Sequence, residues 1–230
     1  MAEDAPAAVF HLAALTRLSD CEDRPALAHS VNVQGSANVF GAMPEGARGL
    51  LASTCHVYGR PQVACVDEEQ PTDPRGVYAQ SKFDAEREAL ASGRDVVIAR
   101  AFHHTGPGQA PTFVLANWAA QMRAGQSQIA VGDLDIRRDF CDVRDTVEGY
   151  RLLLNRGEAG TVYNLASGHA ERLGTFFDWM CGGRPCAPAV QAERLRTNDI
   201  PVFCGDPARA EAVGWRRRYA IKDTLAEMAR

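Results

Sequence analysis

Tyr78 and Lys82 stand four residues apart in the segment Tyr-Ala-Gln-Ser-Lys and offer a phenol and an ammonium for acid–base chemistry. Side chains at this spacing lie on one face of a helix, so the ammonium can approach the phenol. A neighbouring positive charge favours the phenolate, and we therefore expect Lys82 to lower the pKa of Tyr78 from its usual value of about 10. A tyrosine tuned in this way can donate or accept a proton near neutral pH. The spacing alone equally fits a surface tyrosine packed on a lysine stem. The neighbouring motifs are therefore needed to distinguish a catalytic pair from a structural one.

A hydroxyl side chain stands upstream of this pair, at the end of a predicted strand. Residues 53–59 read Ser-Thr-Cys-His-Val-Tyr-Gly. Thr54 is thereby placed where its hydroxyl can hydrogen-bond a substrate oxygen that Tyr78 also contacts. The predicted catalytic residues are Thr54, Tyr78 and Lys82.

The elements that must position these residues follow from the hydrophobic pattern. Short β-rich apolar runs alternate with longer helical patterns, which is typical of an α/β fold with a parallel sheet. We predict strands at 9–14, 49–54, 96–102, 128–132 and 161–165, and helices at 25–43, 77–91, 113–123 and 145–155. The first helix is expected to turn Leu27, Val31, Ala37 and Phe40 toward the core. The second places Tyr78, Lys82 and Glu86 on one face.

Composition excludes several classes of protein. The 230 residues are 46% apolar and 23% charged, which suits one substantial core with a smaller lobe. With 25 basic and 29 acidic residues the net charge is −4, and no basic stripe is present to bind nucleic acid. No apolar run approaches the ~18–20 residues that span a bilayer. The acidic start Met-Ala-Glu-Asp differs from a signal peptide, so we expect a cytoplasmic protein.

The cysteines are odd in number and scattered along the chain. No two form a C-x-x-C pair, which argues against a disulfide framework and against a zinc site. We expect no bound metal, and reduced, mostly buried thiols at the seven positions Cys21, Cys55, Cys65, Cys141, Cys181, Cys186 and Cys204.

Taken with further stretches, these motifs resemble the extended short-chain dehydrogenase/reductase family of NAD-dependent epimerases and dehydratases. The matching stretches are 53–59, 78–82, 10–14 (Phe-His-Leu-Ala-Ala), 31–35 (Val-Asn-Val-Gln-Gly), 67–71 (Asp-Glu-Glu-Gln-Pro) and 138–145 (Arg-Asp-Phe-Cys-Asp-Val-Arg-Asp). The resemblance implies a Rossmann-like doubly wound parallel sheet that binds NADP or NAD. It also implies a set of cofactor-binding residues: Ala13, Ala14, Tyr78, Lys82, Phe102 and His104.

Within that family, three segments are similar to the GDP-4-dehydro-6-deoxy-D-mannose reductases. They are 100–109 (Arg-Ala-Phe-His-His-Thr-Gly-Pro-Gly-Gln), 131–140 and 194–207, the last ending in Cys-Gly-Asp-Pro. This branch implies reduction of the C4 ketone of a GDP-4-keto-6-deoxyhexose with NAD(P)H. A guanidinium suits the diphosphate and a carboxylate suits ribose or base edges. The substrate-binding residues implied are His103, Arg138, Arg196 and Asp199.

Four departures from the family pattern leave alternatives open. The dehydratases carry a glutamate base two places after the catalytic threonine, and this chain has His56 there. Ala101 stands where the family has proline, and His103 where it usually has asparagine. The G-x-x-G-x-x-G turn that holds the pyrophosphate does not occur in the sequence, and the match begins at Val9, in the family's fourth strand. The alternatives are therefore another NAD-dependent nucleotide-sugar epimerase or dehydratase, and an inactive truncated fragment that binds a nucleotide sugar or a partner.

The resemblance also sets expectations for the architecture. We expect the sheet to lack its first strands, so that strand 9–14 forms an exposed apolar edge. Residues 1–103 with about 137–166 should form a partial cofactor domain, and 104–136 with 167–230 a small interwoven substrate lobe. A homodimer through helix 77–91 is implied by the family, although inward packing explains its apolar residues Phe83, Ala85 and Leu90 equally well.

Overall fold

The computed structural model describes residues 5–195 and 199–230, and the chain divides into two compact units. The first unit consists of Met1–Ala101, Glu148–Leu165 and Asp206–Trp215. The second consists of Phe102–Val147, Ala166–Gly205 and Arg216–Arg230. Each unit has its own set of strands.

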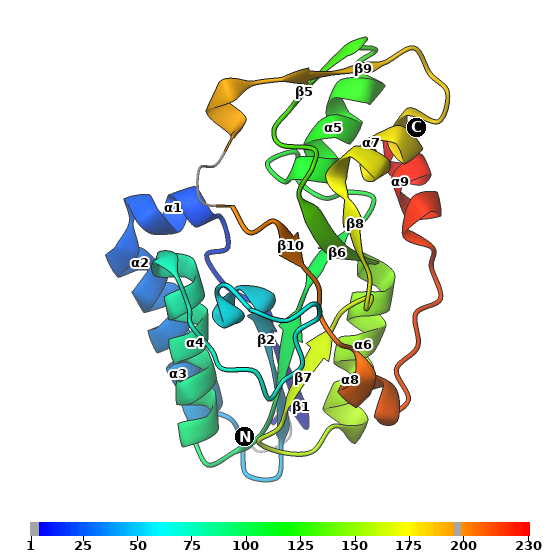
Figure 1. Ribbon diagram of the computed structural model, residues 1–230. Coiled ribbons are helices and arrows are strands. Elements are labelled where there is room, and N and C mark those ends of the chain that lie inside the picture. The colour runs from blue at the N-terminus through cyan, green and yellow to red at the C-terminus, as the bar shows by residue number, and fades with distance from the viewer. Residues whose placement is uncertain (1–4, 196–198) are drawn as a thin grey trace. The chain divides into compact units, whose positions relative to one another are not determined.

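The first unit contains a four-stranded parallel sheet, as the sequence pattern predicts. Its strands lie in the order β1 (Ala8–His11), β2 (Arg48–Thr54), β3 (Asp95–Ala101) and β7 (Val162–Leu165). Figure 1 shows α3 (Gly35–Gly41) and α4 (Gly76–Ala91) on one side of these strands, with α8 (Ala208–Ala212) and the later part of α6 (Val143–Arg156) on the other. Sequence-distant helices thus cover both faces of a buried parallel sheet, which is the Rossmann-like arrangement.

The predicted helix 25–43 is interrupted by a turn of π-helix. The chain forms α2 (Pro25–His29), the π-helical segment η1 (Ser30–Gln34) and then α3. A π turn holds an extra residue, so it shifts the helical phase that the sequence pattern assumes. The expectation that Leu27 faces the core is wrong, because Leu27 is 41% exposed. Four-residue steps instead bury Ala28, Asn32, Ser36 and Phe40.

The edge of the sheet is the one expected from the sequence. Among the described residues β1 pairs with β2 alone, and Phe10 and Leu12 are exposed. The chain then continues to α1 (Leu18–Asp23), which packs against α4.

The second unit is built from short strands and three packed helices. Strand β6 (Arg137–Asp142) lies between β10 (Val202–Phe203) and β4 (His103–Thr105), with β8 (Ala170–Arg172) antiparallel to it, and β5 (Gln128–Val131) pairs with β9 (Ala187–Val190). Helices α5 (Val114–Arg123), α7 (Leu173–Cys181) and α9 (Ile221–Ala229) pack on one another (Figure 1). Their core includes Trp118, Phe176, Phe177 and Leu225.

The expectation that all cysteines are reduced is wrong. Cys181 at the end of α7 forms a disulfide with Cys186. The two cysteines are five residues apart in the sequence, so the bond closes a small loop. Cys21, Cys55 and Cys141 are reduced and buried, as predicted. Across residues 5–195 and 199–230, every helix is too short or too polar to cross a membrane.

Candidate active site

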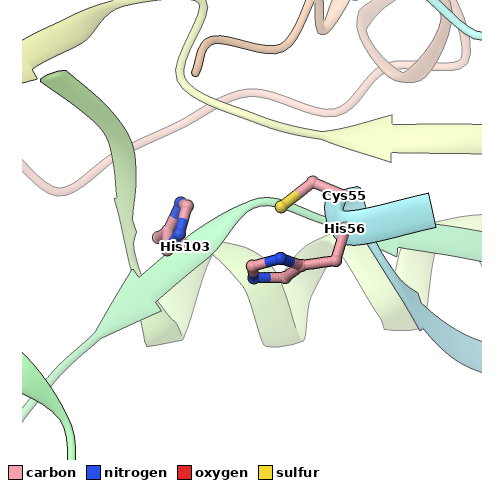
Figure 2. A group of neighbouring side chains, drawn as sticks. All are labelled: Cys55, His56 and His103. Carbon is pink, nitrogen blue, oxygen red and sulfur yellow. The ribbon is translucent and has the colours of Figure 1, made fainter. Parts of the chain in front are cut away.

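The carboxyl end of β2 carries Thr54 and turns directly into the short 3-10 helix η2 (Cys55–Tyr58). Thr54 Oγ1 accepts a hydrogen bond from the backbone N–H of His56 at 3.3 Å, which caps η2 and fixes the threonine hydroxyl. Gly59 ends η2 with a φ of +62°, and a Cβ there would lie 2.0 Å from the carbonyl oxygen of Asp73. Figure 2 shows the Cys55 and His56 side chains on η2, and His103 on β4 of the second unit.

The start of α4 is fixed by a side chain from α1. Glu22 Oε1 accepts the backbone N–H of Val77 at 2.8 Å and so satisfies one of the free amides of the first turn. A carboxylate also suits the positive end of the helix dipole. Gly76, with a φ of +82°, allows the close approach of Glu22. This contact sets the position of α4 and therefore of Tyr78.

Tyr78 lies beside Thr54, and the threonine hydroxyl favours the ionised form of the phenol. The His56 ring packs edge-on against the Tyr78 ring, with centroids 5.9 Å apart. The expectation that a lysine lowers the tyrosine pKa is wrong, because burial dominates and raises the pKa of Tyr78 to about 12, the Thr54 hydroxyl acting in the opposite direction. Tyr78 is consequently a protonated phenol at neutral pH and is suited to donate a proton.

Lys82 lies one turn further along α4 and is 3% exposed. Burial lowers the pKa of this ammonium to about 8, and the negative charge of Glu86 opposes that shift. The lysine therefore changes charge in a pH range in which enzymes work.

The loop after β1 contains Ala13 and Ala14, the first of them exposed. Asn32 of η1 holds this loop at Leu15: its Oδ1 accepts the Leu15 N–H at 2.7 Å, and its Nδ2 donates to the Leu15 carbonyl at 3.0 Å. The same Nδ2 donates to Ser81 Oγ on α4 at 2.9 Å. One buried amide thus ties the loop to the helix that carries Tyr78 and Lys82.

In the second unit, three predicted residues lie in or just before β4. His104 Nδ1 donates to the carbonyl of Phe102 at 3.0 Å, and burial lowers the pKa of His104. The ring of His103 packs against Phe140 and Phe203, with centroids 5.2 and 6.3 Å away.

The predicted substrate ligands Arg138 and Asp199 form an ion pair with each other in the second unit. The Arg138 guanidinium also donates to the backbone carbonyls of Arg137 and Ile200, at 2.8 and 2.6 Å. A guanidinium held by three acceptors has a fixed orientation. Arg196 lies outside the described residues.

Two residues that adjoin the catalytic candidates, Asn32 and Glu86, have no functional role predicted from the sequence. Asn32 lies in the matched segment 31–35, but its contact with Leu15 depends on the π turn. The four-residue spacing of Lys82 and Glu86 indicates that they share a helix face. The ion-pair partner of Glu86, Arg100, comes from β3, and the spacing does not indicate it. The pairing of distant elements is what the sequence does not reveal.

A parallel sheet with Thr54 at the carboxyl end of β2, and with Tyr78 and the buried Lys82 on helix α4, defines a Rossmann-like α/β enzyme. Comparison with known proteins agrees with this class. Residues 1–166 match the NAD dependent epimerase/dehydratase family. The chain belongs to this family.

Individual relatives are similar over nearly the whole chain. A GDP-6-deoxy-D-mannose reductase from Pseudomonas aeruginosa is 34% identical, over 96% of this chain and 78% of the relative. A structure of RMD from Pseudomonas aeruginosa complexed with NADPH superposes with a TM-score of 0.90 at 32% identity, over 99% of this chain and 80% of that one. A GDP-mannose 4,6-dehydratase from Sinorhizobium fredii is 25% identical, over 98% of this chain and 74% of the relative.

Proposed function

We propose that this chain reduces the C4 ketone of a GDP-4-keto-6-deoxyhexose, with NADPH or NADH as reductant. The observation that carries the proposal is the protonated Tyr78 phenol beside Thr54, at the carboxyl end of β2. The similarity to a GDP-6-deoxy-D-mannose reductase supports the choice of substrate.

The reaction needs a hydride at C4 and a proton on the oxygen that was the ketone. When bound, the reduced nicotinamide supplies the hydride. Tyr78 donates its phenolic proton to the alkoxide oxygen, and Thr54 holds that oxygen through its capped hydroxyl. Lys82 is proposed to act on the cofactor ribose, since burial and not the lysine sets the pKa of Tyr78.

The residues of the first unit fit the nicotinamide-ribose half of the cofactor. Lys82 and Tyr78 offer donors to ribose hydroxyls, and the loop with Ala13 and Ala14 follows the carboxyl end of β1, where dinucleotides bind in open parallel sheets. Phe102 and His104 are proposed to complete the cofactor contacts. The sequence has no G-x-x-G-x-x-G turn for the pyrophosphate, so no residue is assigned to that half.

The second unit is proposed to bind the sugar nucleotide; the cofactor ligands come from the first unit, apart from Phe102 and His104. Arg138 is oriented by three acceptors and suits a diphosphate oxygen. His103, Asp199 and Arg196 are proposed as further ligands of the GDP-hexose.

Reduction is favoured over dehydration by the residue next to the tyrosine. The elimination carried out by the family's dehydratases needs a carboxylate base, and His56 occupies that position against the Tyr78 ring. Reduction needs only the proton donor that Tyr78 provides.

The test is a calorimetric titration of NADPH and NADH into the purified chain, followed by NADPH consumption with GDP-4-keto-6-deoxymannose. We expect micromolar cofactor binding and turnover that depends on the ketone. A chain that is folded by circular dichroism but binds neither cofactor, or that binds NADPH and leaves the ketone unreduced, contradicts the proposal. Stabilisation by UDP or dTDP sugars in preference to GDP sugars favours another epimerase or dehydratase activity.

The oligomeric state and the cellular location are further proposals. Leu90 on α4 is exposed, which supports a homodimer through this helix. Light scattering of the wild type and of Leu90→Arg tests it, and a monomeric wild type contradicts it. The reduced, buried thiols Cys21, Cys55 and Cys141 suit a cytoplasmic location and the Cys181–Cys186 disulfide does not; cell fractionation tests the location.

A further inference from the structure

Lys82 carries its charge in a place that water hardly reaches. An ammonium without a partner in such surroundings loses its proton, because burial penalises the charged form. Glu86 lies one helical turn away and is 2% exposed. The side chain of Glu86 is 3% exposed, about as little as that of Glu68, which pairs with Arg209.

Two side chains from the sheet hold the Glu86 carboxylate. Arg100 of β3 binds both of its oxygens, with Nε at 3.0 Å and a terminal nitrogen at 2.7 Å. Ser53 of β2, the residue before Thr54, donates its hydroxyl to Oε1. Three hydrogen bonds from two side chains therefore fix the carboxylate.

The anchor of Glu86 is itself fixed. Arg100 is 5% exposed, and its guanidinium lies over the Tyr58 ring, 4.8 Å from the centroid. The Tyr58 hydroxyl donates to Asn164 Oδ1 at 2.8 Å. The cluster of Lys82, Glu86 and Arg100 thus contains two cations and one anion, and only Glu86 offsets the positive charge.

We propose that Glu86 is a positioning residue for the reduction, whose carboxylate, fixed by Arg100 and Ser53, keeps Lys82 in its charged ammonium form beside Tyr78. The kinetic consequence rests on the proposed function, whereas the effect on the charge of Lys82 does not.

Other titratable groups surround Lys82 and must be considered. The positive charge of Lys82 helps to lower the pKa of His11 on β1, after burial. Further titratable groups lie on elements packed against α4: Asp20, Cys21, Glu22 and Asp23 on α1, His29 on α2, Arg48 on β2, Cys55, His56 and Tyr58 on η2, and Asp95 and Arg100 on β3. Glu86, and none of these other groups, is the group whose charge raises the pKa of Lys82.

The sequence makes a direct measurement possible, because Lys82 and Lys222 are its only lysines. In the full chain with Lys222→Arg and ¹³C-labelled lysine, a single Cε resonance reports the protonation of Lys82. We expect a titration near pH 8 in this background. Adding Glu86→Gln should move it down by ~1–2 pH units, the effect of losing a close opposite charge.

Glu88→Gln is the matched control, since Glu88 is exposed on the same helix. Its charge is screened by water, so we expect a shift of less than ~0.3 pH units. An unchanged Lys82 titration in Glu86→Gln, or an equal shift in Glu88→Gln, overturns the proposal.

A second variant covers the case in which Glu86→Gln fails to fold with Arg100 unpaired. Glu86→Gln combined with Arg100→Gln replaces the ion pair with two amides that can bond each other. Because a repelling cation leaves together with the carboxylate, the Lys82 titration should still fall, by less than in the single variant. An unchanged or raised value contradicts the proposal.

Reductase kinetics give the functional arm. The alkaline limb of the kcat profile should move to lower pH in Glu86→Gln by the same interval as the NMR titration. A loss of kcat that is equal at every pH indicates a merely structural role and rejects the inference. If the chain shows no reductase activity at all, the NMR titration still decides the charge of Lys82, so the two failures are distinguishable.

Discussion

Two arginine–carboxylate pairs, one in each unit, share chemistry and differ in surroundings. Arg100–Glu86 has side chains that are 7% and 3% exposed, and Arg138–Asp199 has side chains that are 10% and 26% exposed. Both arginines come from strands. Glu86 comes from a regular helix, whereas Asp199 lies in an irregular segment that water reaches.

The difference indicates which pair can change partners. A buried carboxylate held by Arg100 and Ser53 cannot be replaced by a ligand, so that pair is permanent. Asp199 is open to water and can leave Arg138 while the backbone carbonyls keep the guanidinium oriented, as the proposed binding of a diphosphate requires. We therefore expect variants of the first unit to affect turnover and folding, and variants of the second to affect substrate affinity.

The largest effect is expected from Tyr78→Phe, which removes the proton donor. It should reduce kcat by ~10²–10⁴-fold, the usual contribution of a general acid, and leave the KM for the GDP sugar nearly unchanged. Steady-state kinetics with Tyr219→Phe as control test this, because Tyr219 lies on the exposed side of the second unit. A change confined to KM would contradict the expectation that variants of the first unit affect turnover and variants of the second affect substrate affinity.

Arg100→Gln should be the most destabilising change to either pair. Breaking a buried pair leaves Glu86 uncompensated, which costs about 3–5 kcal/mol of unfolding free energy. Urea denaturation followed by circular dichroism measures the loss. A cost below about 1 kcal/mol, the range of exposed pairs, would show that the Arg100–Glu86 pair is not structural.

Arg138→Gln should raise the KM for the GDP sugar by roughly 10- to 100-fold, because hydrogen bonds to a charged group are worth ~1.5–3 kcal/mol. The kcat should change little, since Arg138 makes none of the proposed proton transfers. Arg137→Gln, which removes an exposed neighbouring charge, is the control. Equal effects in both variants would indicate non-specific attraction of the diphosphate.

Asp199→Asn should have the smallest effect on stability, below ~1 kcal/mol, because its ion pair is open to water. Its KM should rise less than that of Arg138→Gln if Asp199 contacts ribose. Urea denaturation measures the stability, and steady-state kinetics the KM, of Asp199→Asn, of Arg138→Gln and of the variant that combines them. A stability loss as large as that of Arg100→Gln would contradict the comparison of the two pairs.

The sequence predicted the first unit better than the second. Strand 96–102 is a continuous β-branched run, and helix 77–91 differs from α4 by one residue at its start. Strand β6 was not predicted because Arg-Arg-Asp-Phe-Cys-Asp is strongly charged. Its burial depends on remote partners: Asp139 accepts backbone N–H groups of Ser167, Gly168 and Gly205.

The candidate site shows the same contrast. The contact of Thr54 with Tyr78 could be predicted from motif order, because both lie at the carboxyl end of the sheet. The direction of the Tyr78 pKa shift could not, since spacing reveals the nearby lysine and not the depth of burial. The pairing of Arg138 with Asp199 also escaped prediction, because 61 residues separate them.

The π turn at Ser30–Gln34 limits how this chain can vary in length. Deleting one residue there would restore an ordinary α-helix and rotate α2 by about 100° relative to α3. Asn32 would then face away from either Leu15 or Ser81. The segment should therefore tolerate substitutions of its exposed residues far better than any single-residue deletion. The length of the segment, as well as its side chains, positions the candidate active site.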